Sequence, residues 1–153
     1  MTTDQDAPRP MRSATAHKAA LAEAEARCKA RGEAWTPPRC PTYELLLAAA
    51  GPRTAYELMA GLKRGARYVG PPTVYRALDF LLAIGLAHRV ESRKAYLACA
   101  APGDPHTAAF LICDRCGRTD ELLHHLDDWG PAPAGFVVRA VTLEIRGDCP
   151  ACR

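Results

Sequence analysis

The stretch Pro71-Pro72-Thr73-Val74-Tyr75-Arg76-Ala77-Leu78-Asp79-Phe80-Leu81-Leu82 decides the fold that this sequence predicts. Its small and large apolar side chains recur every three or four residues, which is the pattern of an amphipathic helix. Proline in the first turn favours a helix start at Pro72-Thr73, and Gly85 ends the helix. The opposite face is polar and carries an arginine, which is typical of a helix that reads DNA.

The segments around this helix complete the order of a winged helix-turn-helix. A helix is expected over about 15–31, and a second runs from Thr36-Pro37-Pro38 to about Ala50. A third opens at Thr54-Ala55-Tyr56-Glu57, which has capping-box spacing. After the fourth helix, strands are expected over 86–90 and 95–98, joined by the polar turn 91–94. Residues 1–98 are therefore predicted to form a winged-helix DNA-binding domain that begins with a mobile arm, 1–14.

The rest of the chain has a different pattern. Residues 99–105 are rich in Gly, Pro and Ala and are predicted to be a hinge. Strands are expected over 108–113, 117–122 and 136–145, a short helix over 122–129 and a loop over 131–135. The predicted fold class is α+β, with a winged helix-turn-helix followed by an α/β dimerisation domain over 106–153.

Charge is distributed unevenly along the 153 residues. Residues 1–100 hold 15 Lys/Arg against 9 Asp/Glu, whereas residues 101–153 hold 5 against 8. This asymmetry fits a nucleic-acid-binding front half. No apolar run approaches the ~20 residues that a bilayer requires, and residues 1–20 lack an apolar signal core, so a cytoplasmic protein is expected.

Two CxxC pairs, Cys113-Asp114-Arg115-Cys116 and Cys149-Pro150-Ala151-Cys152, give the strongest chemical signal. Two residues between cysteines let both thiolates point at one ion, and two such knuckles make a tetrahedral tetrathiolate site that suits zinc. The alternatives are a redox pair or two unrelated pairs. Pairs at opposite ends of a half-domain argue against the redox role, and a closed site of four cysteines leaves no position for catalysis.

A second zinc set is weaker from spacing alone. Two imidazoles, a thiolate and a carboxylate suit zinc chemically, and these ligands would join the two halves of the chain: His88, Cys99, His106 and Glu121. Cys28 and Cys40 lack a partner pattern and are expected to be packing residues. One of His124 and His125 is a weak candidate for an extra metal site.

Exposed residues of the third and fourth helices are the candidate DNA contacts. The candidates for base readout are Tyr56, Thr73, Tyr75 and Arg76, because arginine near the start of a recognition helix can bind guanine. Basic residues nearby are expected to contact phosphates; they are Arg39, Lys63, Arg64, Arg67, Arg93 and Lys94.

Several of these motifs together resemble the ferric uptake regulator (Fur) family. The stretch 71–81 is similar to its recognition-helix signature. The stretch 85–92 with Tyr96, Cys99 and 106–117 is similar to its zinc-responsive branch, the zinc uptake regulators. The resemblance covers roughly 15–153 and implies a zinc-bound homodimer that binds an AT-rich inverted repeat and represses zinc-uptake genes.

The resemblance also implies roles for individual residues. It places a structural zinc at Cys113, Cys116, Cys149 and Cys152, and a regulatory zinc at His88, Cys99, His106 and Glu121, which makes two zinc ions per monomer. Tyr56 and Arg76 fall on the base-contacting pair.

The chain departs from the family at two positions, and other readings remain open. His106 stands alone where iron-type members have a histidine-rich run, which favours zinc, and Arg146 stands where many members have histidine, which puts a third site in doubt. The alternatives are a regulator of the same fold that senses iron, manganese or peroxide, and a constitutive DNA-binding protein with structural zinc. An enzyme is not expected, because neither metal set leaves an open coordination position.

Overall fold

The computed structural model describes residues 14–63, 69–104, 106–124, 132–138 and 141–153, without the side chains of Lys63 and His124. The chain divides into two compact units, Met1–Cys99 and Ala100–Arg153. The boundary falls within the segment predicted to be a hinge, whose motion stays a prediction. The predicted mobile arm lies outside the described residues, apart from Ala14, which begins the first helix.

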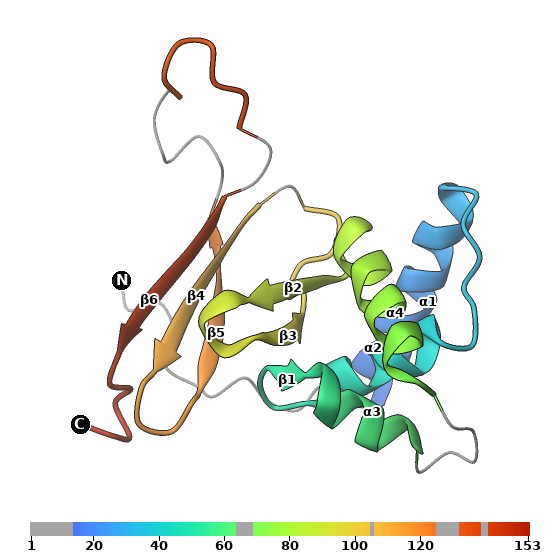
Figure 1. The fold of residues 1–153 in the computed structure, drawn as a ribbon, viewed down its shortest axis with the longest axis horizontal. Helices are drawn as coiled ribbons and strands as arrows, with labels where there is room; N and C mark the ends of the chain where they lie inside the picture. Colours follow the sequence, from blue (N-terminus) through green and yellow to red (C-terminus); the bar gives the residue numbers. More distant parts are fainter. Residues whose placement is uncertain (1–13, 64–68, 105, 125–131, 139–140) are drawn as a thin grey trace. The chain divides into compact units, whose positions relative to one another are not determined.

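The first unit contains four helices, labelled in Figure 1. They are α1 (Ala14–Ala30), α2 (Arg39–Ala48), α3 (Ala55–Lys63) and α4 (Pro71–Ala83). Helix α4 has Gly70 as its N-cap and Pro71 and Pro72 in its first turn. Gly85, at φ +71°, follows it in the left-handed conformation that glycine adopts without steric cost. The α4 boundaries predicted from sequence are confirmed to within one residue at the start.

The start of α2 differs from the prediction. The helix was expected to start at Thr36-Pro37-Pro38, but it begins at Arg39 and its N-cap position is Pro38, without a side-chain cap. Thr36 acts instead through its backbone carbonyl, which accepts from the N–H groups of Arg39 and Cys40. Ala50 lies beyond the end of the helix and is exposed, because the two prolines that precede Arg39 and the pair Gly51-Pro52 confine the helix to the residues between them.

A small antiparallel sheet completes this unit. Its strands are β1 (Arg53–Thr54), β2 (Ala87–Val90) and β3 (Ala95–Ala98), in the order β1-β3-β2. A 3₁₀ turn, Glu91–Arg93, joins β2 to β3 and ends at Lys94, whose φ of 47° closes the tip. The predicted hairpin, or wing, is thus confirmed, whereas β1 was not foreseen.

Apolar faces of all four helices and the hairpin enclose one core. The helical stripe read from the sequence is buried: Val74, Leu78 and Leu81 of α4 are fully inaccessible. Each such side chain contributes about 1.5–3 kcal/mol relative to exposure. The remaining buried members of this core are Ala20, Ala24, Cys28, Tyr43, Leu46, Leu47, Ala55, Leu58, Met59, Ile84, Leu86, Ala87, Tyr96 and Ala98.

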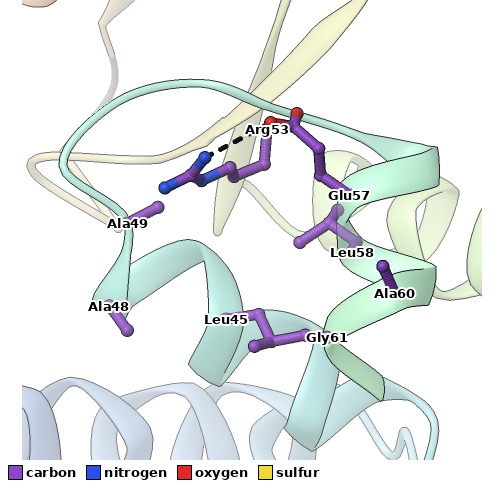
Figure 2. A pocket seen from close by; sticks show the side chains of 8 residues that line it. All are labelled: Leu45, Ala48, Ala49, Arg53, Glu57, Leu58, Ala60 and Gly61. Carbon is purple, nitrogen blue, oxygen red and sulfur yellow. Dashed lines mark hydrogen bonds and ion pairs between the residues drawn. The ribbon is translucent and has the colours of Figure 1, made fainter. Parts of the chain in front are cut away.

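The capping box at the start of α3 has the predicted geometry. The Thr54 N–H and hydroxyl donate to Glu57 Oε2 at 2.8 and 2.9 Å, and the Glu57 N–H donates to Thr54 Oγ1 at 3.3 Å. These bonds, led by the one from the Thr54 N–H, lower the pKa of Glu57. Arg53 pairs with the same carboxylate at 3.3 Å (Figure 2). The box therefore fixes the helical turn on which Tyr56 lies.

A cavity of about 330 Å³ lies beside this turn, between α2 and α3 (Figure 2). Its wall is mostly apolar, and Leu45 lies against Gly61, where an added Cβ would meet Leu45 Cδ1 at 2.8 Å. Gly61 thus allows the close approach of the two helices. The lining residues are Leu45, Ala48, Ala49, Arg53, Glu57, Leu58, Ala60 and Gly61.

Loss of the cap is expected to destabilise the first unit. Thr54→Ala removes a side-chain cap, which costs about 1 kcal/mol of unfolding free energy. The matched control is Thr73→Ala, since no side chain caps α4. Glu57 has a depressed pKa, so the stabilisation is present above the unfolded pKa of the carboxyl and is lost as the pH falls through the folded value. Urea unfolding at pH 7 and pH 3 measures both effects; an equal cost for the two variants would contradict the cap.

The second unit contains a three-stranded mixed sheet. Its strands are β4 (Thr107–Cys113), β5 (Thr119–His124) and β6 (Thr142–Gly147), in the order β5-β4-β6. Strand β4 pairs antiparallel with β5 and parallel with β6, with Cys113 opposite Gly147. The α+β fold class is confirmed.

Two predictions for this unit are wrong in part. Residues 122–124 were expected to begin a helix, but they extend β5, because their backbone groups pair with Thr107–Ala109 of β4. The rest of that predicted helix lies mostly in 125–131, outside the described residues. The long strand expected over 136–145 begins only at Thr142, and residues 136–138 are exposed and not in a strand, since only residues from Thr142 onward meet β4. Among the described residues, no helix is long and apolar enough to cross a membrane.

Candidate metal centre and nucleic-acid interface

The parallel pairing of β4 and β6 brings the two CxxC pairs together. Cys113 ends β4 and Cys116 closes the turn that follows, while Cys149 and Cys152 lie just beyond β6. Because Cys113 is opposite Gly147, both knuckles follow the strands at the same end of the sheet. The two pairs, which are far apart in the sequence, therefore lie close together in space.

The four sulfur atoms have the dimensions of a zinc tetrathiolate. All four Sγ atoms lie within 4.8 Å of one another, and Cys116 Sγ is 3.7 Å from Cys149 Sγ. Tetrahedral zinc with Zn–S bonds of ~2.3 Å requires sulfurs about 3.8 Å apart. None of the seven cysteines, all of which lie among the described residues, forms a disulfide, so these four sulfurs can act as ligands.

Backbone donors favour ionisation at one of these sulfurs. The Cys116 N–H, followed by the Cys149 N–H, donates to Cys113 and lowers its pKa to about 6. The side-chain hydrogen bond with Cys149, together with the other sulfurs, raises the pKa of Cys152 to about 12. A divalent cation bound at the centre of the four sulfurs would favour the thiolate form of all four, because thiolates are the species that bind it.

The second predicted set has two of its residues in each unit. In the first unit, His88 on β2 is opposite Leu97 of β3, and the Cys99 N–H continues the ladder by donating to Leu86 O at 2.9 Å. Since side chains alternate along a strand, His88 and Cys99 lie on the same face of the hairpin. Two soft-to-borderline zinc ligands are thus diagonal neighbours.

In the second unit, His106 and Glu121 face each other. His106 Nδ1 is 2.6 Å from Asp104 O, which only accepts, so Nδ1 carries the hydrogen. Nε2 lies 3.0 Å from Glu121 Oε1, while Glu121 Oε2 accepts from the Ala100 N–H. At this distance Nε2 either donates its own hydrogen to the carboxylate or, as a lone pair facing a second acceptor, requires a cation between the two atoms. An imidazole whose other nitrogen donates to a carbonyl is also the usual arrangement of a metal-bound histidine.

The candidate base contacts lie on exposed surfaces of α3 and α4. Tyr56 is 79% exposed in the first turn of α3, and Tyr75 is 45% exposed on α4. Thr73 and Arg76 are exposed on the same α4 surface, opposite the buried stripe. The sequence therefore separated the packing face from the free face correctly.

The candidate phosphate contacts differ in their exposure and in their intramolecular partners. Arg93 is exposed in the hairpin turn, and so is Lys94. Arg39 has intramolecular partners that the sequence did not indicate: its guanidinium lies 3.3 Å from the centre of the Phe80 ring and donates to Ala34 O at 2.5 Å. The Lys63 side chain, Arg64 and Arg67 lie outside the described residues.

The two cysteines outside both metal sets lie in the first unit, and the adjacent histidines, His124 and His125, come at the end of β5 in the sequence. Cys28 is buried in the core of the first unit, where burial raises the pKa of its thiol. Cys40 is half-buried, with its sulfur 3.9 Å from a Glu44 oxygen. His124 ends β5, and His125 lies outside the described residues.

Residues 30–145 match the sequence pattern of the ferric uptake regulator family. The chain belongs to this family. Proteins of the ferric uptake regulator family are transcriptional regulators, which agrees with the prediction that the chain is not an enzyme.

Within the family, the zinc regulators are similar to this chain. It is 40% identical to the zinc uptake regulation protein of Escherichia coli K12, over 86% of this chain and 80% of the relative. A solved zinc uptake regulator in complex with zinc and DNA matches 92% of this chain and 96% of its own, at 36% identity and a TM-score of 0.81. The holo form of XcZur matches 86% and 95%, at 41% identity and a TM-score of 0.74.

Proposed function

We propose that this protein is a zinc-responsive transcriptional repressor of the bacterial cytoplasm. Its zinc-bound homodimer binds an AT-rich inverted-repeat operator and represses zinc-uptake genes. The observation that carries this proposal is the 36% identical relative solved with both zinc and DNA, which covers 92% of the chain. The exposed α4 surface and the four clustered sulfurs add independent support.

Two zinc ions per monomer are proposed, and the first is structural. Cys113, Cys116, Cys149 and Cys152 hold it, and the sulfur spacing supports this assignment. Four thiolates fill the tetrahedral coordination sphere, so the ion has no free position. It joins the end of β4 to the last residues of the chain.

The second ion is proposed to be regulatory. His88 and Cys99 come from the first unit, and His106 and Glu121 come from the second. Support comes from the shared hairpin face of the first pair and from the 3.0 Å separation of His106 Nε2 and Glu121 Oε1 in the second. The Cys99 thiolate and the Glu121 carboxylate balance the charge of a divalent ion, and the thiolate favours zinc over harder ions. Because the ligands belong to both units, the bound ion would favour one domain arrangement over others.

The DNA contacts follow from the exposed surfaces. Arg76 is proposed to bind a guanine edge, with Tyr56, Thr73 and Tyr75 contacting neighbouring bases or their methyl groups. Phosphate contacts are proposed for Arg39, Lys63, Arg64 and Arg93. For Arg39, contact with a phosphate requires its guanidinium to leave, or to share, the partners that it has in the structure.

The homodimer is proposed to form through the second unit. Leu111 and Ile145 are opposite each other on β4 and β6 and are 40% and 43% exposed, so one sheet face presents apolar surface. Phe136 and Val137 add further exposed apolar area. A dimer with an operator of matching two-fold symmetry then places one α4 in each half-site.

A mobility-shift assay across buffered free zinc tests the proposed function. A fragment from a zinc-uptake promoter should be shifted in zinc and released on chelation, while the tetrathiolate zinc remains bound. Zinc counting on the same samples should give two ions per monomer before chelation and one after it. A response to iron or manganese but not zinc would favour the other metal-sensing reading, and binding that ignores zinc would favour a constitutive protein.

Cys99→Ser is expected to remove the zinc response of operator binding. Coupling free energies between two sites usually correspond to ~5-fold to 150-fold changes in affinity, and the variant should bind DNA with the same low affinity with and without zinc. The matched control is Cys40→Ser, which changes a half-buried cysteine outside both metal sets. Titrations by fluorescence anisotropy measure the affinities; an unchanged zinc dependence in Cys99→Ser would overturn the regulatory assignment.

A further inference from the structure

Charged residues that flank the zinc knuckles pair across them. Arg146, which precedes the second knuckle, donates from Nε and Nη2 to Asp114 Oδ1 inside the first knuckle, at 2.9 and 2.7 Å. Arg115, also inside the first knuckle, pairs with Asp148 beside the second, at 3.3 Å. The signs are reversed in the two pairs, so each knuckle offers one cation and one anion to the other.

The backbone aligns these residues. The Asp114 N–H donates to Gly147 O at 2.8 Å, and this bond extends the β4–β6 register beyond Cys113. It holds the first knuckle against the residues between Arg146 and Asp148. The ion pairs are therefore part of the junction that brings the four sulfurs together.

The charge of the metal site gives these pairs a role that isolated surface pairs lack. Exposed ion pairs usually contribute little, and these side chains are 38–64% exposed. A zinc tetrathiolate, however, carries a net charge of −2, and Asp114 and Asp148 are each next to a ligand in sequence. Without their arginine partners, both carboxylates would repel the site.

We propose that Asp114–Arg146 and Arg115–Asp148 form a charge clasp that keeps the two knuckles together and slows the loss of zinc from the tetrathiolate. These four residues are positioning residues that act through the cysteines. The clasp would therefore make the structural zinc slower to dissociate than the regulatory zinc. This inference rests on the proposed structural zinc.

The test measures the rate of metal release from the full-length protein. Cobalt serves as the probe, because tetrahedral thiolate coordination gives visible absorption bands, and excess chelator starts the release. Every chain in this test, the unmodified one included, carries Cys99→Ser, so that the four cysteines of the two knuckles are the only thiolate ligands of the two proposed sites. Arg146→Gln is expected to release cobalt about 3-fold to 10-fold faster than the unmodified chain at low salt. The matched control is Arg27→Gln, because Arg27 pairs with Glu23 at 3.4 Å within α1 of the first unit, so the variant also loses an arginine from an ion pair but changes neither knuckle.

Two further measurements distinguish a clasp from general loosening. At ~1 M salt, where charges are screened within ~3 Å, the unmodified chain should release cobalt almost as fast as Arg146→Gln. The double variant Asp114→Asn/Arg146→Gln should release it more slowly than Arg146→Gln alone, because the unpaired carboxylate beside the thiolates is gone.

The outcomes separate failure of the clasp from failure of the proposed function. Equal release rates for Arg146→Gln and the unmodified chain, or a rate difference that persists at high salt, would overturn the clasp. A double variant that releases cobalt as fast as Arg146→Gln or faster would overturn it as well. If the unmodified chain shows no tetrathiolate absorption with cobalt, the structural zinc itself fails, and the proposed function fails with it.

Discussion

Cys113→Ser is expected to abolish the structural zinc and unfold the second unit. Its described part is one small three-stranded sheet, and the four sulfurs tie the end of β4 to the last residues of the chain. A core of this size is marginal without a metal or another cross-link. In zinc-finger peptides the apparent free energy of zinc binding, about 10–16 kcal/mol, is also folding free energy. The loss should therefore exceed that of any single core substitution in this unit.

The measurements for this variant are zinc content, circular dichroism and sedimentation. The variant should hold at least one zinc fewer than the unmodified chain and should be monomeric, because the proposed dimer surface lies on the unfolded sheet. Cys40→Ser is the control, because it removes a cysteine that contacts Glu44 and none of the four ligands. A dimeric Cys113→Ser protein with a full zinc complement would show that the cluster is not a metal site.

Arg76→Ala is expected to remove sequence-specific operator binding. Arg76 is exposed on the α4 surface opposite Val74 and Leu78, so the substitution changes the free face without opening the core. A bidentate contact between arginine and guanine is worth about 1–3 kcal/mol. The homodimer would make two such contacts, so the expected loss is about 2–6 kcal/mol, or about 30-fold to 20,000-fold in affinity.

The salt dependence and the sequence dependence of binding check the assignment. Arg76→Ala should lose affinity for the operator far more than for random DNA. Arg93→Ala is the matched control, because a phosphate contact at the hairpin should weaken binding to both DNAs about equally and reduce the salt slope by about one per monomer. Equal losses of affinity for operator and random DNA in Arg76→Ala would show that Arg76 contacts the DNA phosphates and not a base.

Local patterns predicted the winged helix well, because the residues that determine each element lie within a few positions of one another. The α4 stripe, the Thr54–Glu57 capping box and the left-handed Gly85 depend on side chains or backbone preferences inside one or two turns. The two CxxC pairs are local in the same sense, since each knuckle is one turn. These features were therefore readable without knowledge of the tertiary fold.

Features that depend on partners distant in sequence were missed or misplaced. Residues 122–124 have a composition compatible with a helix, yet their hydrogen bonds go to β4. Nothing in the sequence indicated a partner for the Arg39 side chain, but its guanidinium contacts the ring of Phe80, which lies 41 positions further along the chain. Intrinsic propensity is a weak preference that tertiary pairing overrides.

The sequence by itself determined the family, the exposed face of α4 and the two CxxC pairs, because residue type and spacing are sufficient for each. Only the tertiary structure decided how the thiolates meet. The parallel register of β4 and β6 places Cys113 opposite Gly147 and brings Arg146 to Asp114. Strand pairing sets this register across a gap of 32 residues between the knuckles, and no local periodicity encodes a contact over that distance.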